Sequence, residues 1–278
     1  NADRARAIQG VAITNQRETV VVFDRRSGRP LCPAIVWQCR RSDSICKELR
    51  LAGRESLIQE KTGLKLDAYF SASKITWLVR QRPGLVKQLT RGGALIGTID
   101  TYLIYRLTGG CVFATDHTNA SRTLLFDLQR RDWDSRLCEL FEVPPASLPE
   151  IRESFADFGE TDIEGALPQV VPIRGVMGDS QAALFAHRCY APGETKATFG
   201  TGTSFLMTMG HAATAPVGGM VSALAWVHDG QPTYAWEGLI NSSAATIAWL
   251  KDQLGLIDSV ADSERLASEV DDTGGVYL

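Results

Sequence analysis

The sequence predicts an α/β protein of two domains, on the basis of three observations. The chain has 278 residues, which exceeds the usual size of a single domain. Up to residue 188, short apolar strands alternate with helical segments, as in α/β folds. After the break at Ala191-Pro192-Gly193, strands follow one another directly and lead into a helix. We therefore expect one domain over residues 1–188 and the start of a second over residues 189–278.

The amino-acid composition limits the classes of protein to which the chain can belong. Apolar residues make up 44% and charged residues 22% of the chain, which are ordinary globular values. The net charge of −3 gives no electrostatic reason to expect nucleic acid or an anionic membrane as a partner. No apolar run is long enough to span a bilayer. Six cysteines without a C-x-x-C pair suit buried thiols in a reducing compartment, so a cytoplasmic enzyme is expected.

In the first domain, apolar runs predict strands, and helices are predicted where caps and stop signals frame an apolar periodicity. Ser42 is expected to cap one helix, with Gly53 beyond its end, and Pro83 is expected to stop another. Gly109-Gly110 should end a third. The expected strands cover residues 8–14, 19–25, 34–37, 97–100 and 170–173. A polar turn joins the first two into a pair, and a second turn at 26–30 follows this pair. The expected helices cover residues 42–50, 55–62, 73–82, 101–108, 133–141 and 181–186.

In the second domain, strands are expected at residues 195–201, 203–209, 219–228 and 233–239. Asp229-Gly230 is the hairpin turn between the last two. An amphipathic helix should run from 242 to 254, with Ile247 and Leu250 on its apolar face. The chain opens like the end of a helix and stops inside the apolar segment GGVYL, so we expect an internal piece of a larger protein.

Asp179 is the candidate catalytic base. It follows an apolar strand and precedes an apolar helix, and open α/β sheets place their ligands at such turns. The small neighbours Gly178 and Ser180 would let a substrate approach. The alternative is that Asp179 only caps the helix and Gly178 only serves a tight turn.

The turn TFGTGTS is the candidate phosphate site. Glycines between hydroxyl residues let backbone N–H groups and threonine oxygens converge on an anion, which points to Gly200, Thr201 and Gly202. A base on one turn and a phosphate cradle on the next, across a domain boundary, suggest phosphoryl transfer in a cleft.

Polar and aromatic residues at other strand ends are candidates for binding a polyol. Arg17 and Glu18 lie between two apolar strands, where they could exchange hydrogen bonds with hydroxyl groups. Trp37 could pack on a small carbon skeleton, and Tyr69 could place its hydroxyl in the cleft. The alternatives are a solvated turn ion pair for Arg17 and Glu18 and a core position for Trp37.

Familiar signatures of other enzyme classes are missing. The sequence has no G-x-x-x-x-G-K-[ST], G-x-G-x-x-G or H-E-x-x-H motif and no protein-kinase set, which argues against a P-loop NTPase or a Rossmann dehydrogenase. The segment 116–122, DHTNASR, suits a buried, hydrogen-bonded turn. His117 has no His or Cys at metal-binding spacing, so no metal site made by this chain alone is expected.

These segments together resemble the FGGY family of carbohydrate kinases and, within it, the glycerol kinase branch. The resemblance covers almost the whole chain, in the family's order, through ITNQRET (13–19), AIVWQCRR (34–41), DAYFSASK (67–74), GTIDTYLIYRLTGG (97–110), TDHTNASRTLLFDL (115–128), GVMGDSQAALF (175–185) and FGTGTSFLM (199–207). It implies an actin-like, ribonuclease H-like ATPase fold: the remainder of a first domain that binds substrate, and the start of a similar second domain that binds nucleotide.

The resemblance also implies roles. Arg17, Glu18, Tyr69 and Trp37 match residues that hold glycerol, together with Asp179 and Ser180. Asp179 matches the base that takes a proton from the terminal hydroxyl as it attacks ATP, which yields glycerol 3-phosphate, with Mg²⁺ on the ATP phosphates. Thr201, with Gly200 and Gly202, matches a phosphate contact. The resemblance leaves a homodimer or a homotetramer open.

Departures from the family pattern qualify the expected substrate. Ser180 stands where the family usually has Gln, and Ser204 where it has an aromatic residue, so a larger polyol or ketose remains an alternative to glycerol. A non-catalytic paralogue is the third reading. Residues 164–170, EGALPQV, lack the basic residues of the family's fructose 1,6-bisphosphate loop, which predicts no such control. The family's initial Asp-x-Gly-Thr-Thr phosphate loop and late adenine-binding motif are not in this sequence, so this stretch alone should bind ATP poorly.

Overall fold

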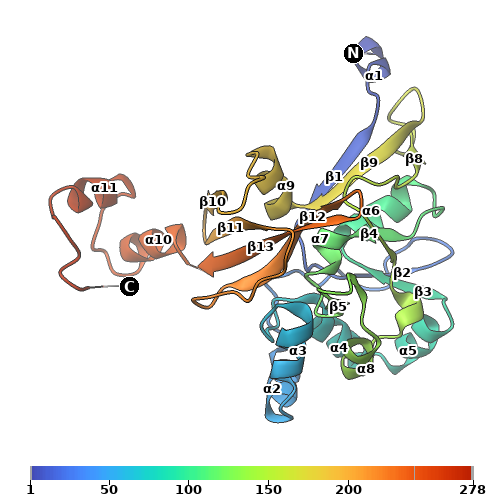
Figure 1. Cartoon of the computed structure of the whole chain (residues 1–278), viewed down its shortest axis with the longest axis horizontal. Coiled ribbons are helices and arrows are strands. Elements are labelled where there is room, and N and C mark those ends of the chain that lie inside the picture. Colours follow the sequence, from blue (N-terminus) through green and yellow to red (C-terminus); the bar gives the residue numbers. More distant parts are fainter. Residues whose placement is uncertain (1, 241, 277–278) are drawn as a thin grey trace.

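The computed structural model describes residues 2–240 and 242–276. Two β-sheets lie next to each other, and helices surround them (Figure 1). Helices α10 (Ala244–Asp252) and α11 (Ala261–Ala267) extend away from the rest, at the left of Figure 1. Within these ranges, no helix combines the length and the apolar character that crossing a membrane demands.

The first sheet has three strands. β1 (Val11–Asn15) and β9 (Val171–Gly178) run parallel, with Asn15 opposite Gly178. β8 (Glu160–Thr161) lies antiparallel on the other edge of β9. Because parallel strands end at the same edge of a sheet, the segments that follow β1 and β9 emerge next to each other. These segments carry the Arg-Glu pair and the candidate base.

The second sheet is antiparallel, and its four strands are those expected after the Pro-Gly break. A turn with Asp229 and Gly230 at φ of 48° and 74° makes the predicted hairpin, because such turns match the twist of the paired strands. The strands lie in the order β10 (Thr195–Phe199), β11 (Thr203–Gly210), β13 (Gln231–Ile240) and β12 (Val221–His228).

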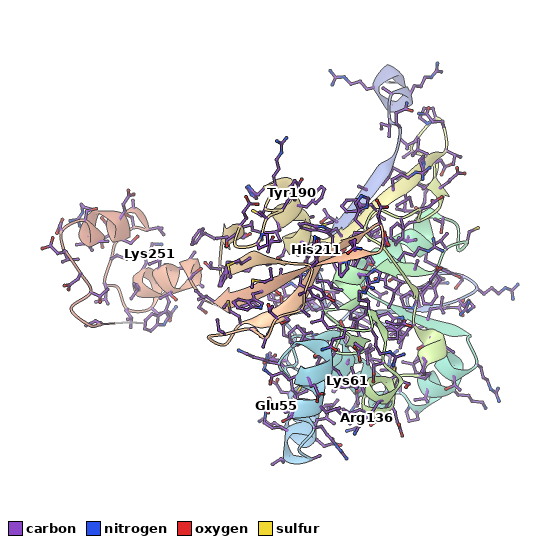
Figure 2. The ribbon with its side chains drawn as sticks, in the orientation of Figure 1. Glu55, Lys61, Arg136, Tyr190, His211 and Lys251 are labelled. Carbon is purple, nitrogen blue, oxygen red and sulfur yellow. The ribbon has the colours of Figure 1, made fainter. Side chains whose placement is uncertain are left out.

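Shorter strand pairs and helices complete the first part of the chain. Lys61, labelled in Figure 2, lies in the last turn of its helix and donates to Asp127 and Asp134 at 3.2 and 2.6 Å. These bonds hold the helix end against the strand pair of residues 126–133. The pairs are β2 (Val21–Asp24) with β3 (Ala94–Gly97), β4 (Ala114–Asp116) with β7 (Glu150–Arg152), and β5 (Phe126–Asp127) with β6 (Asp132–Trp133). The helices are α1 (Ala2–Arg6), α2 (Asp43–Leu51), α3 (Glu55–Thr62), α4 (Ser71–Gln81), α5 (Pro83–Thr90), α6 (Ile99–Leu107), α7 (His117–Ala120), α8 (Ser135–Leu140), a 3-10 turn (Pro145–Ser147) and α9 (Asp179–Ala186).

Apolar packing joins the second sheet to the first part of the chain. The largest cluster packs α2 to α5 against β2 and β3. Leu224 and Val227 of β12 pack with Ala120 and Phe126, and seven of the eight β12 residues are buried. A strand buried on both faces holds its position firmly, because a shift would break contacts on either side. This packing fixes the second sheet beside the edge where β1 and β9 end.

Three strand predictions were wrong. The strand expected at 97–100 ends at Gly97, and α6 begins at Ile99. The strands around residues 8–14 and 19–25 do not pair with each other, because β1 pairs with β9 and β2 with β3. The turn between them contains Glu18 at a φ of 62°, which redirects the chain toward a different sheet. Residues 34–37 form no strand, and only Ile35 makes a single bridge, to Val20.

Two helix starts differ from the predictions, and one helix was not expected. α4 ends at Gln81, as predicted from the stop at Pro83, but Pro83 also begins the unexpected α5, because proline is well suited to the first turn of a helix. Trp133 lies in β6, and the helix starts at Ser135, where Asp134 accepts a hydrogen bond from the Leu137 amide at 2.9 Å. The Ser42 hydroxyl meets the Ser73 hydroxyl at 2.9 Å and does not cap α2.

The helix expected at residues 242–254 is present as α10. None of its side chains is buried, and Trp249 is 43% exposed. Gly274 and Gly275 form a turn, not a strand. Residues 277–278, the end of the expected strand, lie outside the described residues.

Candidate active site

The turns after β1 and β9 open into one large cavity. Its volume is about 900 Å³, within the usual range of small-molecule sites. The Nε atom of Arg17 lies 3.5 Å from Oδ1 of Asp179, so the Arg-Glu turn and the candidate base face the same space. The cavity wall includes the following residues that the sequence singled out: Arg17, Glu18, Trp37, Tyr69, Asp179, Ser180, Thr201, Gly202 and Ser204.

Arg17 is held at two of its three nitrogens. Its Nη1 donates to Gln181 Oε1 at 3.1 Å and its Nη2 to Glu237 Oε1 at 2.8 Å. Its Nε is buried and has no hydrogen-bond partner within the described residues, although it lies 3.8 Å from Glu18 Oε1. Buried donors are normally satisfied, so this unpaired N–H beside the cavity is a candidate contact for a ligand atom.

A glycine is needed at position 178 because the Arg17 side chain lies very close to its backbone. Its φ is negative, so the backbone conformation is not the reason for a glycine here. A Cβ atom there would lie 2.7 Å from Cγ and Cδ of Arg17. The glycine at the end of β9 therefore makes room for the arginine that follows β1. The close approach of the Arg17 side chain was anticipated neither by the prediction that Gly178 admits a substrate nor by the alternative of a tight turn.

Glu18 sits in a strained and buried position. Its φ of 62° is uncommon for a residue with a side chain, and such strain gathers at functional sites. Ser71 Oγ donates to its carbonyl oxygen at 3.1 Å, and Arg122 Nε donates to its Oε1 at 2.7 Å. Burial raises the pKa of Glu18 despite the opposing effect of Arg17 and Arg122.

Arg122 and Glu237 complete this network, and the sequence reading missed both. Arg122 Nη1 and Glu237 Oε2 form an ion pair at 2.5 Å. The angles at these two atoms do not meet those of a hydrogen bond. Burial alone would raise the pKa of Glu237, but Arg122 and Arg17 hold it below its usual value. The sequence did contain one signal for Glu237, an acidic residue at an inward position of a buried strand. A charge buried at such a position needs a partner.

Trp37 and Tyr69 form the aromatic side of the cavity. Their ring centroids lie 5.5 Å apart in an edge-to-face arrangement. Asp67 Oδ1 accepts the Tyr69 amide at 2.7 Å, and Lys74 Nζ donates to the carbonyls of Ala68, Tyr69 and Phe70. Burial raises the pKa of Tyr69, so its hydroxyl keeps its proton. The turn thus presents a fixed ring and a hydrogen-bonding hydroxyl.

Asp179 is the exposed acid of this group. Its side chain is 55% exposed and begins α9, and its Oδ1 accepts the Ser180 amide at 2.7 Å. A carboxylate that faces a cavity and keeps free lone pairs can accept a proton from a bound hydroxyl.

The turn around Thr201 differs from the expected cradle of amides. The Gly200 amide donates to the Gly202 carbonyl at 2.9 Å and is not free to bind an anion, and Gly200 is not among the residues that line the cavity. The carbonyls of Gly200 and Thr201 accept amides from residues 243–245. Thr201 and Gly202 remain at the cavity wall.

The site and the fold together agree with the comparison with known proteins. The model of the FGGY family of carbohydrate kinases, N-terminal domain, matches residues 3–186. The chain belongs to the FGGY family. This confirms the resemblance that the sequence motifs indicated.

Relatives of this FGGY chain are glycerol kinases. The glycerol kinase of Desulfitobacterium hafniense is 46% identical over 271 residues, which cover 98% of this chain and 55% of that protein. The crystal structure of Plasmodium falciparum glycerol kinase with ADP superposes with a TM-score of 0.89 at 35% identity, over 96% of this chain and 53% of the other. The chain therefore spans about half the length of the curated relatives it matches.

The fold prediction is confirmed as well. The xylulose kinase of Lactobacillus acidophilus is only 19% identical, but it matches 97% of this chain and 54% of its own with a TM-score of 0.82. The FGGY chain thus has the actin-like, ribonuclease H-like architecture, with the β1–β9 sheet in the first part and the β10–β13 sheet in the second.

The residues present fit a nucleotide phosphate better than a resident metal. The cavity wall offers the hydroxyls of Thr198 and Thr201 and the buried ammonium group of Lys196, which suit phosphate oxygens. In the described ranges, the one group of three side chains close enough to share a metal ion lies elsewhere, with ligand atoms within 4.8 Å of one another: Glu153, His228 and Asp229. His117 is not part of it, since its Nδ1 lies 2.8 Å from the Arg152 carbonyl.

Proposed function

We propose that the protein transfers a phosphoryl group from ATP to a terminal hydroxyl of a small polyol, with glycerol as the first candidate and glycerol 3-phosphate as the product. The observation that carries this proposal is the free Nε–H of Arg17, which lies between the carboxylates of Asp179 and Glu18 at 3.5 and 3.8 Å. A hydroxyl group placed there could accept from Arg17 and donate to either carboxylate. The family and the relatives support a kinase.

In this proposal, the first part of the chain orients the polyol. Arg17 and Glu18 hold two hydroxyls, the Tyr69 hydroxyl contacts a third group, and Trp37 packs on the carbon skeleton. Ser180 lies at the same wall. Rigid positioning of this kind contributes much of the rate enhancement in phosphoryl transfer, because the reacting groups lose little further freedom.

Asp179 acts as the general base. The terminal hydroxyl oxygen forms a bond to the γ-phosphorus, the bond from that phosphorus to the β,γ-bridging oxygen breaks, ADP leaves, and the hydroxyl proton passes to Asp179. Thr201 and Gly202, with Gly200 shaping the turn, lie where the phosphates would bind. Mg²⁺ carried by the nucleotide would neutralise phosphate charge. The domain division at residues 188 and 189 assigns the polyol to one side and the nucleotide to the other.

A larger polyol or a ketose is the second candidate, because two small side chains line the polyol part of the cavity. The small side chains of Ser180 and Ser204 contribute to this space. A cytoplasmic location, the homodimer or homotetramer and the lack of fructose 1,6-bisphosphate control remain predictions.

The full-length protein should be assayed with ATP and Mg²⁺ against glycerol, erythritol, xylulose and ribulose. Activity on glycerol that is lost in Asp179→Ala supports the proposal. Activity on a ketopentose alone favours the second candidate. A folded protein that turns over none of these substrates would be a non-catalytic paralogue.

A further inference from the structure

Lys196 is a buried cation that lacks a charged partner. It lies in β10, and only 4% of the residue is exposed. Its Nζ donates to Thr198 Oγ1 at 2.8 Å, and no carboxylate within the described residues comes within 4.0 Å of it. An ammonium group has three donors, so Thr198 occupies only one of them. A buried charge in this condition is costly unless a ligand pairs with it.

The other buried cations of this region have more partners than Lys196, although Arg17 Nε and both Nη atoms of Arg122 make no hydrogen bond within the described residues. Arg17 bonds Gln181 and Glu237, and Arg122 contacts Glu18 and Glu237. Lys74 donates to three backbone carbonyls. Lys196, with a single hydroxyl as its hydrogen-bond partner, has fewer partners than any of these three, which indicates that a further partner comes from outside the described part of the chain.

The surroundings of Lys196 indicate the sign of that partner. Glu18 and Glu237 each lie within 4.0 Å of Arg17 and of Arg122. Asp179 lies 3.5 Å from Arg17 and its side chain is 55% exposed. These acids therefore pair with the arginines, and the ammonium group of Lys196 remains without an anion within 4.0 Å among the described residues. Lys196 also lines the same cavity as the candidate base and the threonine turn. An anion that enters the cavity would balance this charge where phosphate chemistry is expected.

We propose that Lys196 binds the phosphoryl group as it moves from the nucleotide to the polyol, a proposal that rests on the function proposed above. The ligand class is a phosphate monoester or the terminal phosphate of a nucleotide. Lys196 remains protonated throughout and donates to the peripheral oxygens of the phosphorus, while the proton of the attacking hydroxyl goes to Asp179. A fixed cation in a water-poor site stabilises charge on the transferring group strongly.

Burial lowers the pKa of Lys196 and Arg17 adds to this effect, while Glu237, Asp179 and Cys189 oppose it. A bound phosphate would oppose both influences and raise that pKa. A lysine with only a structural role would show no such response. This difference separates the proposal from the alternative that Lys196 simply fills space beside β11.

The test uses the full-length protein and compares Lys196→Met, Lys196→Arg and the matched control Lys47→Met, which removes an exposed lysine from α2. Isothermal calorimetry measures the affinity for glycerol and for glycerol 3-phosphate. We expect Lys196→Met to bind glycerol as the wild type does and to lose at least about tenfold in affinity for glycerol 3-phosphate, the effect of one charge-assisted hydrogen bond. Lys196→Arg should retain part of this affinity.

Thermal unfolding of the same variants provides an independent measurement. Without ligand, Lys196→Met should be as stable as the wild type or more so, because an unpaired buried charge is replaced by an apolar side chain of similar length. The rise in Tm on adding glycerol 3-phosphate should be smaller in this variant. Unchanged affinity and an unchanged ligand-induced rise in Tm would overturn the proposal.

A measurement on the wild type covers the case in which Lys196→Met fails to fold. Lysine-selective ¹⁵N NMR should show that the pKa of Lys196 rises when glycerol 3-phosphate binds, and a constant pKa would overturn the proposal. A wild type that binds glycerol but shows no Lys196 response contradicts the role of Lys196 alone. A wild type that binds neither glycerol nor glycerol 3-phosphate and has no kinase activity contradicts the proposed function itself.

Discussion

Arg17 donates a hydrogen bond to Glu237 at 2.8 Å, although 220 positions separate the two residues in the chain. Arg17 follows β1 in the first sheet, and Glu237 lies in β13 of the second. The second sheet therefore supplies the anchor for an arginine that we propose to bind the polyol. Closing or shifting one sheet against the other would change the position of this guanidinium group.

Glu237→Ala should lower both stability and polyol affinity. Removing one partner of a buried ion pair leaves the other charge uncompensated, which costs about 3–5 kcal/mol, and two arginines lose their partner here. Glu237→Gln should cost less because the amide oxygen can still accept from Arg17. Urea unfolding and glycerol calorimetry on the full-length protein measure the two effects.

Glu164→Gln is the matched control, because Glu164 forms an exposed ion pair with Arg106 at 2.7 Å. Exposed pairs contribute about 0–1 kcal/mol, so this variant should resemble the wild type. Equal losses in the two variants would contradict a special role of the buried network.

Gly178→Ala should displace Arg17. The added Cβ would lie 2.7 Å from two Arg17 carbon atoms, and overpacking of this kind costs about 1–3 kcal/mol. We expect a higher KM for the polyol and a lower Tm. Gly84→Ala in α5 is the control, since a Cβ there meets nothing within 4 Å. A Gly178→Ala variant with normal KM would show that Arg17 can move without loss.

Asp179→Asn should abolish most turnover and leave polyol binding nearly intact. The amide cannot accept a proton from the attacking hydroxyl, and loss of a general base typically lowers kcat by about 10²–10⁴-fold. Steady-state kinetics and glycerol calorimetry on the same preparation separate the two properties. A variant with wild-type kcat would exclude Asp179 as the base.

Ser180→Gln combined with Ser204→Phe should narrow the cavity and favour glycerol over larger substrates. One or two extra contacts in a pocket change discrimination by about 1–3 kcal/mol, so the ratio of kcat/KM for glycerol to that for a ketopentose should rise by at least about tenfold. Ser180→Ala with Ser204→Ala changes little volume and serves as the control. An unchanged ratio would mean that neither serine borders the substrate.

Asp100 should make stability depend on pH. Burial, reinforced by Asp116, raises its pKa to about 6. Because this carboxyl holds its proton more tightly in the folded state, its contribution to stability is full below its usual pKa of 3.8 and is lost as pH rises through about 6. Asp100→Asn should reduce that loss, by up to about 3 kcal/mol between pH 4 and pH 7.

Urea unfolding at several pH values measures this difference. Thr98 and Thr115 donate to the Asp100 carboxylate at 2.6 Å, and one of these hydrogen bonds must change in the variant, so the slope with pH matters more than the absolute stability. Glu139→Gln on the exposed face of α8 is the control and should keep the wild-type slope. The same slope in Asp100→Asn would contradict the assignment.

Local signals predicted most of the elements correctly. Apolar runs located β9 and the strands after residue 190, and Asp229-Gly230 marked its hairpin because only a few residue types accept positive φ. Signals that depend on context were less complete. Pro83 marks the end of one helix, as predicted, but also begins the next, and the Ser42 hydroxyl contacts Ser73 instead of capping α2.

The sequence by itself determined the family and the residue types of the candidate site, because motifs such as NQRE and GDSQ are short and lie at the ends of recognisable strands. Only the tertiary structure decided how these turns meet. It revealed Arg122 and Glu237 as partners, and Lys196 as a buried cation without one. The physical reason is that ion pairing and burial depend on distances between residues far apart in the chain, which a pattern of neighbours does not contain.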